Sequence, residues 1–422
     1  MDYDMRTDFS RLKQGLPPES AALLDEITVG IQPFAEFLEE KYLAEYISKG
    51  GSKIKFVTGR PGSGKSHFLN YLSAKAKRQG FIAINFSAKN VWLHDFKEVY
   101  LEIYRRCDLM ACLSRCAEKI ILELGYDPKD VGAGMTFADY LSSLGDLDAI
   151  TKKEIRNQLQ QLFLKNPLVD NNFAAACSLL TGGILGHPAM EDSSKELLLG
   201  WLENDKEAKL AAVRKLGLSP SRITKYNARH MLRSLAEIHR IAGYPGFLVT
   251  VDDMGILAGP GPMDTIRYTK LKREDAYECI RELIDEIDTL KNIMFVFAFD
   301  RRLIDDELTG VKSYQALWMR IQNEIMSDRF NQFTDIIDLD GLGRHIYNEE
   351  NLAQMSERLV NVANRVGQKA LILSSHQGEV FVGNDQHATT ALPRLVGAVT
   401  LDVAAFDEAA SELERGDEDV RF

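Results

Sequence analysis

Residues 55–72 read KFVTGRPGSGKSHFLNYL, an apolar run followed by a glycine-rich turn that ends in Lys-Ser. The mainly apolar residues 53–58 predict a buried strand, and Phe68, Leu69 and Leu72 recur at helical spacing. The turn between them fits the pattern G-x-x-x-x-G-K-[ST] and consists of Gly59, Arg60, Pro61, Gly62, Ser63, Gly64, Lys65 and Ser66. A strand, this turn and a helix in succession distinguish a phosphate-binding loop from a chance glycine turn.

The chemistry of this loop predicts its ligand. Glycines let backbone N–H groups turn inward around an anion, and the N-terminus of the following helix adds its dipole. Lys65 is placed to reach the β- and γ-phosphates, and the Ser66 hydroxyl is placed to bind Mg²⁺. His67 follows directly and is counted with the loop, although capping the turn or packing is the alternative. We therefore predict that the loop binds ATP together with Mg²⁺.

A pair of carboxylates ends a second apolar run, LVTVDD at residues 248–253. In parallel sheets, ligands bind at the edge where the carboxyl ends of the strands meet. We expect Asp252 to hold Mg²⁺, through water, and Asp253 to polarise the attacking water. The alternative is that both carboxylates only cap a turn.

Two further elements are candidates for contact with the γ-phosphate. Asp300 ends the apolar run VFAFD, although an Asp that merely starts a turn gives the same pattern. Arg329, in IMSDRFNQF, is the candidate that stabilises transition-state charge on the nucleotide of a neighbouring chain. A surface salt bridge is the alternative for Arg329, and its competitors for the role are Arg301, Arg302 and Arg320.

The last candidate lies near the C-terminus, in TTALPRLVGAV. Pro393 is suited to open a helix, which places Arg394 in the first turn. A cation there is unfavourable for the helix dipole unless it reaches an anion. We therefore favour Arg394 as a nucleotide contact over a solvated arginine.

The order of apolar segments predicts the fold class. Short apolar runs separated by helical patterns imply an α/β fold with a parallel sheet covered on both faces. The predicted strands are residues 53–58, 81–87, 246–253, 293–300 and 334–342. A chain of 422 residues is too long for one compact core. We expect a helical arm at residues 1–50 and a core in two parts, at 51–100 and 246–342. A large helical insertion at 101–245 separates the two parts, and a C-terminal helical lid follows at 343–422.

Bulk composition bounds the environment and the partners. We expect no membrane span, because no run of about 18 apolar residues occurs, and no secretory signal, because the first residues are charged. Five cysteines at these spacings form no disulfide framework or zinc site, which favours a reducing cytoplasm. The net charge of −11 argues against a protein that coats nucleic acid. Residues 206–233 are nevertheless strongly basic. A solvated helix face is the default interpretation of this segment, and a nucleic-acid contact is the alternative.

The order of these elements resembles that of AAA+ ATPases, above all their origin-recognition (initiator) branch. Longer strings are similar to the ATP-binding proteins of bacteriophage-exclusion (BREX) defence systems, the BrxD type, over nearly the whole chain. These strings are FVTGRPGSGKSHFL, LAEIHRIAGYPGFLVTVDDMG, AYECIRELIDEID and ALPRLV. The resemblance implies an oligomeric ATPase that acts on double-stranded DNA within a complex of antiviral proteins.

One departure from the resemblance bears on turnover. Asp253 stands where most AAA+ relatives carry Glu, so its carboxylate is withdrawn by roughly 1–1.5 Å. A misplacement of about 1 Å can lower a catalytic rate roughly 100-fold. Three functions therefore remain open: an ATPase motor or switch on DNA, an ATP-bound scaffold that recruits protein partners with little turnover, and a small-molecule kinase.

Overall fold

The computed structural model describes residues 2–261, 264–322, 334–385 and 388–403. Its centre is a five-stranded sheet in the order β2-β3-β4-β1-β5, and every pair of neighbouring strands is parallel. The strands are β1 (Ser52–Gly59), β2 (Ile82–Ser87), β3 (Phe247–Asp252), β4 (Ile293–Asp300) and β5 (Ile336–Asp338). This architecture confirms the predicted α/β class with a parallel sheet.

The register of the strands decides which residues meet at the carboxyl edge of the sheet. Gly59 at the end of β1 lies opposite Asp300 of β4, and Ser87 at the end of β2 lies opposite Asp252 of β3. β1 and β4 end level with each other, as do β2 and β3, and the parallel pairing places all four carboxyl ends on the same side of the sheet. The loop after β1 and the carboxylates after β3 and β4 share one edge of the sheet.

Helices cover both faces of the sheet, as its apolar strands require. One face packs against α4 (Lys65–Arg78) and the N-terminal arm, with Val57, Leu248 and Val296 in the shared core. The arm consists of α2 (Ala21–Ile27), α3 (Gln32–Phe37) and a π-helix (Leu38–Ile47). The opposite face packs against α5 (Phe96–Arg106), α12 (Ala228–Ile241) and α13 (Lys270–Glu286).

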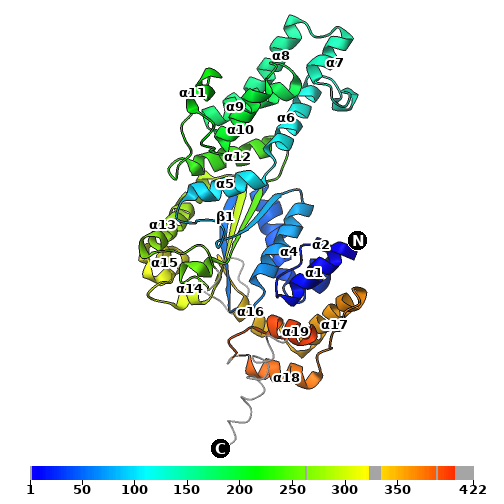
Figure 1. Ribbon diagram of the computed structural model, residues 1–422, viewed down its shortest axis with the longest axis vertical. Coiled ribbons are helices and arrows are strands. Elements are labelled where there is room, and N and C mark those ends of the chain that lie inside the picture. The colour runs from blue at the N-terminus through cyan, green and yellow to red at the C-terminus, as the bar shows by residue number, and fades with distance from the viewer. Residues whose placement is uncertain (1, 262–263, 323–333, 386–387, 404–422) are drawn as a thin grey trace, which may run out of the picture.

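The helices between α5 and α12 form a lobe at one end of the long axis of the molecule (Figure 1). They are α6 (Leu109–Glu123), α7 (Phe137–Leu144), α8 (Ala149–Leu159), α9 (Asn171–Leu185), α10 (Asp192–Leu202) and α11 (Leu210–Lys215). The C-terminal helices lie at the opposite end of that axis. They are α16 (Leu339–Ile346), α17 (Glu349–Arg365), α18 (Ser375–Asn384) and α19 (Leu392–Thr400).

The N-terminal arm joins the C-terminal helices to the sheet. Phe9 of α1 (Asp2–Lys13) and Ile27 of α2 pack with Leu352, Phe381 and Leu395 in one apolar core. Leu24, on the same α2, packs instead against the sheet side. The arm therefore belongs to both cores.

One predicted boundary was wrong. The last strand ends at Asp338 and not at 342, because the Asp338 carboxylate accepts the N–H of Asp340 and starts α16. Helix α13 begins at Lys270, after the N-cap Thr269. The short helices α14 (Arg302–Asp305) and α15 (Gln315–Gln322) follow β4. Among the described residues, no helix is long and apolar enough to cross a membrane.

Candidate functional site

The glycine-rich loop joins β1 to α4 at the carboxyl edge of the sheet. Gly62 and Gly64 have φ values of +82° and +88°, a left-handed backbone that glycine adopts at little cost. A Cβ on Gly59 would lie 2.4 Å from the Ser63 hydroxyl oxygen, so any other residue at position 59 would have to displace Ser63. Gly64 directly precedes α4, a helix of 14 residues, so the N-terminus of that helix faces the loop.

The ammonium group of Lys65 lies inside the loop. Its Nζ donates to the carbonyl oxygens of Gly59 and Arg60, at 2.8 and 2.9 Å. Burial lowers the pKa of Lys65, and the carboxylates of Asp300 and Asp252 oppose that shift. The loop thus holds a cation where the phosphates of a nucleotide are expected.

Ser66 and Asp252 come together next to this cation. Burial, the larger effect, raises the pKa of Asp252, while the Ser66 hydroxyl lies close enough to its carboxylate to lower that pKa. Mg²⁺ prefers oxygen ligands and is usually held by one or two protein groups together with substrate phosphates and water. In the described part of the chain, no group of three or more His, Cys, Asp or Glu is placed to hold a metal. The Ser66 and Asp252 oxygens fit a magnesium ion shared with a nucleotide.

Asp253 points toward the end of β2. The Ser87 hydroxyl donates to its carboxylate at 2.7 Å, and the Lys89 ammonium lies at 3.4 Å. Its backbone is left-handed, with φ of +59°, which Asp tolerates better than most residues. Ser87 and Lys89 thus fix the orientation of the Asp253 carboxylate, whose oxygens can still accept a hydrogen bond from water.

Asp300 lies beside the loop, opposite Gly59 in the sheet. Its carboxylate accepts hydrogen bonds from the backbone N–H and the Nε of Arg302, at 3.1 and 3.3 Å. The Arg302 side chain is 82% exposed, whereas that of Asp300 is only 15% exposed. Asp300 thus remains a candidate for contact with the γ-phosphate.

The arginine candidates occupy different places. Arg301 binds Asp338, with Nη1 at 3.0 Å from the carboxylate. Arg320 binds Asp285, with Nη2 at 2.8 Å. Arg329 lies outside the described residues, so its role stays a prediction.

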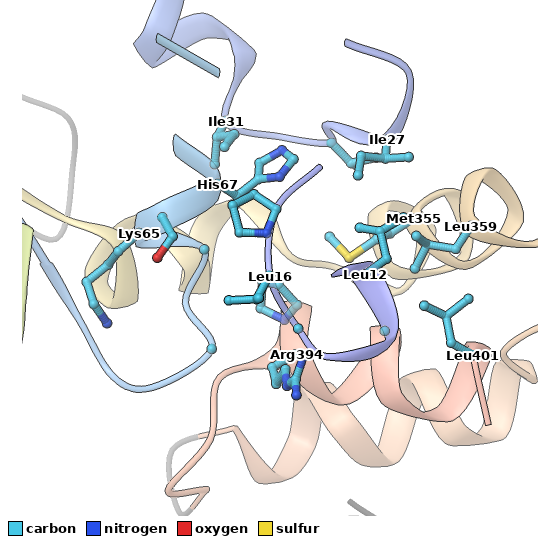
Figure 2. A pocket seen from close by; sticks show the side chains of 18 of the residues that line it. Leu12, Leu16, Ile27, Ile31, Lys65, His67, Met355, Leu359, Arg394 and Leu401 are labelled. Atoms are coloured by element: carbon cyan, nitrogen blue, oxygen red, sulfur yellow. The ribbon is translucent and has the colours of Figure 1, made fainter. Parts of the chain in front are cut away.

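An apolar pocket of about 220 Å³ continues from the loop (Figure 2). Lys65 lies at one end, Leu12, Met355 and Leu359 at the other, and His67 and Arg394 between them. The walls come from the loop, the N-terminal arm and the C-terminal helices. Flat apolar groups with a charged end match such a pocket.

Arg394 lies where the loop, α1 and α19 meet. A Cβ on Gly62 would lie 2.4 Å from the Arg394 Cβ, so the stem of this side chain rests on the loop. Its head reaches the end of α1, where Nη2 donates to the Gln14 carbonyl at 3.3 Å. Burial lowers the pKa of Arg394. Arg394 also lines the pocket, and its contact with a nucleotide stays a prediction.

His67 forms a buried link between α4 and the arm. The Thr28 hydroxyl donates to the Leu24 carbonyl, so it accepts the hydrogen of His67 Nε2 at 2.8 Å. Burial lowers the pKa of His67 to about 4, so the ring is neutral at pH 7. His67 packs between the elements, and it also lines the pocket.

This shift predicts an acid-sensitive stability. In the unfolded chain, His67 takes up a proton below its pKa of about 6.5. In the folded chain it stays neutral until the pH approaches its lowered pKa of about 4. The contribution of the neutral His67 ring to the free energy of unfolding is fully present above pH 6.5 and is lost as the pH falls toward 4. Between pH 6.5 and 4.5 the parent should lose about 2 kcal/mol more unfolding free energy than His67→Gln.

Urea unfolding across this pH range measures the difference. The exposed His376 gives the matched control, because His376→Gln should follow the parent at every pH. A His67→Gln curve parallel to that of the parent would contradict the burial of a neutral ring.

Sequence reasoning missed three contributors to the site. Ser87 and Lys89 hold Asp253, and the parallel register that places Ser87 opposite Asp252 was the signal that could have found them. The pocket wall from α1 was also missed, because helical spacing gives no distance to a loop far along the chain. Arg60, counted as a nucleotide contact, directs its guanidinium to the C-terminal helices instead.

These features define an α/β protein with a phosphate-binding loop, a paired hydroxyl and carboxylate beside it, and a pocket for an apolar group. The chain belongs to the family of BREX system ATP-binding proteins BrxC/D, whose family model matches residues 4–391. The match includes the loop and the aspartate pair and ends before Arg394. No curated protein and no solved structure matches the chain. Membership supports ATP binding in a phage-defence system and confirms the predicted resemblance.

Proposed function

We propose that this protein is an AAA+ type ATPase that binds and hydrolyses ATP with Mg²⁺ and acts as a motor or switch on DNA in phage defence. The observation that carries the proposal is the glycine-rich loop with the Lys65 ammonium inside it, at the sheet edge where Ser66 and Asp252 lie close together. The family, whose members are described as ATP-binding, supports the choice of ATP.

Each residue has a task in this proposal. Backbone N–H groups of Gly62 to Ser66 and the N-terminus of α4 bind the phosphates, and Lys65 turns from the Gly59 and Arg60 carbonyls to the anion. Ser66 and Asp252 hold Mg²⁺, which neutralises charge that develops on the phosphates. The base lies in the apolar pocket between the arm and the C-terminal lid. Asp253 orients the water, with Asp300 and an arginine of a neighbouring copy at the γ-phosphate.

Release of phosphate from ATP tests this proposal. The full chain should release phosphate in Mg²⁺ and not in EDTA, with a rate per chain that rises with protein concentration if copies share a site. Duplex DNA should raise the rate further. No release under any of these conditions would refute hydrolysis and leave ATP binding alone.

A scaffold that binds ATP with little turnover is the second candidate. The contacts of Asp253 with Ser87 and Lys89 favour it, because they engage the carboxylate that hydrolysis would need for the water. For a small-molecule kinase, the third candidate, the sequence carries no acceptor-site signature. Saturable ATP binding with no phosphate release would select the scaffold.

The basic segment 206–233 is our proposed DNA contact. Lys209, Arg214 and Lys215 are exposed around α11, on the lobe far from the loop (Figure 1). Arg222 and Arg229 have structural tasks instead. Arg222 donates to the Asp205 and Lys206 carbonyls, and Arg229 pairs with two glutamates of α13.

Reversing the charge of Lys209, Arg214 and Lys215 to Glu should weaken duplex binding and flatten its salt dependence. Each phosphate contact contributes roughly −0.9 to the slope of log affinity against log salt, so the slope should change by about three. Binding should be measured by fluorescence anisotropy with ATP present.

Three exposed lysines of the same lobe, Lys129, Lys153 and Lys165, form the matched control when changed to Glu. This control carries the same change in net charge. Equal DNA binding by the two variants would show that the face around α11 is only solvated.

A further inference from the structure

Arg60, the first variable residue of the loop, makes five hydrogen bonds that all lead away from the phosphate side. Its backbone N–H and Nε donate to the Asp340 carboxylate, at 2.7 and 3.2 Å. Its Nη1 donates to the carbonyls of Asp385 and Ala388, both at 2.7 Å, and its Nη2 donates to the Asp385 carboxylate at 2.8 Å. Every donor nitrogen of the guanidinium is thus engaged.

The partners of Arg60 belong to two elements far apart in sequence. Asp340 is in the first turn of α16, directly after β5, and its side chain is only 4% exposed. Asp385 follows the last residue of α18, so Arg60 also binds carbonyls at the C-terminal end of that helix. A cation is favourable at such a helix end. Arg60 therefore ties the loop to the sheet edge and to the lid helices at once.

The contact between loop and lid extends beyond Arg60. The backbone N–H of Ala391 donates to the Pro61 carbonyl at 3.0 Å, and Gly62 lies against the stem of Arg394. Consecutive loop residues 60, 61 and 62 therefore touch the lid between Asp385 and Arg394. In contrast, Ser66 and Lys65 face the carboxylates of the sheet edge.

A charged network continues from Arg60 toward the end of β4. Asp340 lies 4.0 Å from Arg301, which binds Asp338 at 3.0 Å. The backbone N–H of Arg301 donates to the Gly59 carbonyl at 3.2 Å, beside Lys65 Nζ on the same oxygen. A change in the Lys65 hydrogen bonds therefore affects both Arg60 and Arg301, the two ends of this network.

We propose that Arg60 is a positioning residue that couples occupancy of the phosphate-binding loop to the position of the C-terminal lid. This coupling rests on the proposed nucleotide site, and it supplies the path by which the lid responds to a bound nucleotide. When Lys65 leaves the Gly59 and Arg60 carbonyls for an anion, the loop shifts, and the rigid fork of Arg60 carries that shift to Asp385. Because coupling is reciprocal, fixing the lid also tightens nucleotide binding.

The test compares four full-length variants by hydrogen exchange with and without saturating ATP and Mg²⁺, and by nucleotide affinity. In the parent, nucleotide should slow exchange both in the loop with α4 and in residues 388–401. In Asp385→Asn and Arg60→Ala, the loop should still respond, the lid should lose at least about half of its response, and affinity should fall about fivefold or more. Arg60→Lys keeps the positive charge but lacks the planar guanidinium. Its lid response and nucleotide affinity should therefore lie between those of the parent and of Arg60→Ala.

Arg344 supplies the control, because it lines the same 130 Å³ cavity as Arg60 and Asp385 and is exposed. Arg344→Ala should respond like the parent in loop, lid and affinity. A full lid response in both Asp385→Asn and Arg60→Ala would overturn the coupling, although nucleotide binding would stand. A parent that shows no response in the loop would instead refute the proposed nucleotide site, and the coupling with it.

Discussion

Replacing Lys65 by Ala should weaken ATP binding by about 30- to 1,000-fold, which corresponds to about 2–4 kcal/mol for the loss of one partner of a buried charge pair. The Lys65 ammonium is the cation inside the loop, and the carboxylates around it would otherwise repel the phosphates. Equilibrium binding of a fluorescent ATP analogue measures the effect.

The fold should survive this change. Lys65 binds two carbonyls of its own loop, and its removal also relieves the cost of burying an ammonium group. We expect the unfolding free energy to stay within about 1 kcal/mol of the parent. Lys77→Ala, on an exposed turn of the same helix, should leave both affinity and stability unchanged. If Lys65→Ala bound nucleotide as tightly as Lys77→Ala, the loop would not be the phosphate site.

Replacing Asp253 by Asn should lower ATP turnover by about 100-fold while binding stays close to that of the parent. Asn lacks the negative charge needed to polarise water, yet it tolerates the left-handed backbone at position 253. Single-turnover phosphate release at saturating ATP measures this rate without interference from affinity.

The glutamate variant tests the same residue in the opposite direction. Asp253→Glu extends the carboxylate by roughly 1–1.5 Å, so turnover should rise or at least be retained, at a cost of about 1 kcal/mol in stability for the left-handed backbone. Ser87→Ala should also raise turnover, because it frees the Asp253 carboxylate from its donor. Equal rates for the Asn, Glu and parent chains would show that Asp253 does not polarise the water.

The sequence predicted the sheet well because buried parallel strands are continuous apolar runs. β4 is the clearest case, since IMFVFAFD is buried except for its last residue. The strand β5 was predicted but its end was not, because only the structure shows that Asp338, its last residue, also caps α16. The spacing of G-x-x-x-x-G-K-S likewise predicted the loop but not the direction of each side chain.

Long-range contacts could not be predicted from these patterns. The partners of Arg60 are Asp340 and Asp385, 280 and 325 residues along the chain. Local periodicity and turn chemistry carry no information at such separations, and the motif itself suggested a phosphate contact for Arg60. The same reason hid the contact between Arg394 and Gln14.

Calorimetric titration of the full chain with ATP in Mg²⁺ tests the central claim most directly. We predict saturable binding of one ATP per chain, weakened about 30- to 1,000-fold in Lys65→Ala and weakened in EDTA, because Ser66 and Asp252 are positioned to hold the metal together with the phosphates. No saturable heat up to about 1 mM ATP would contradict this claim. At that concentration, even a weak site with a Kd of about 1 mM would be half filled.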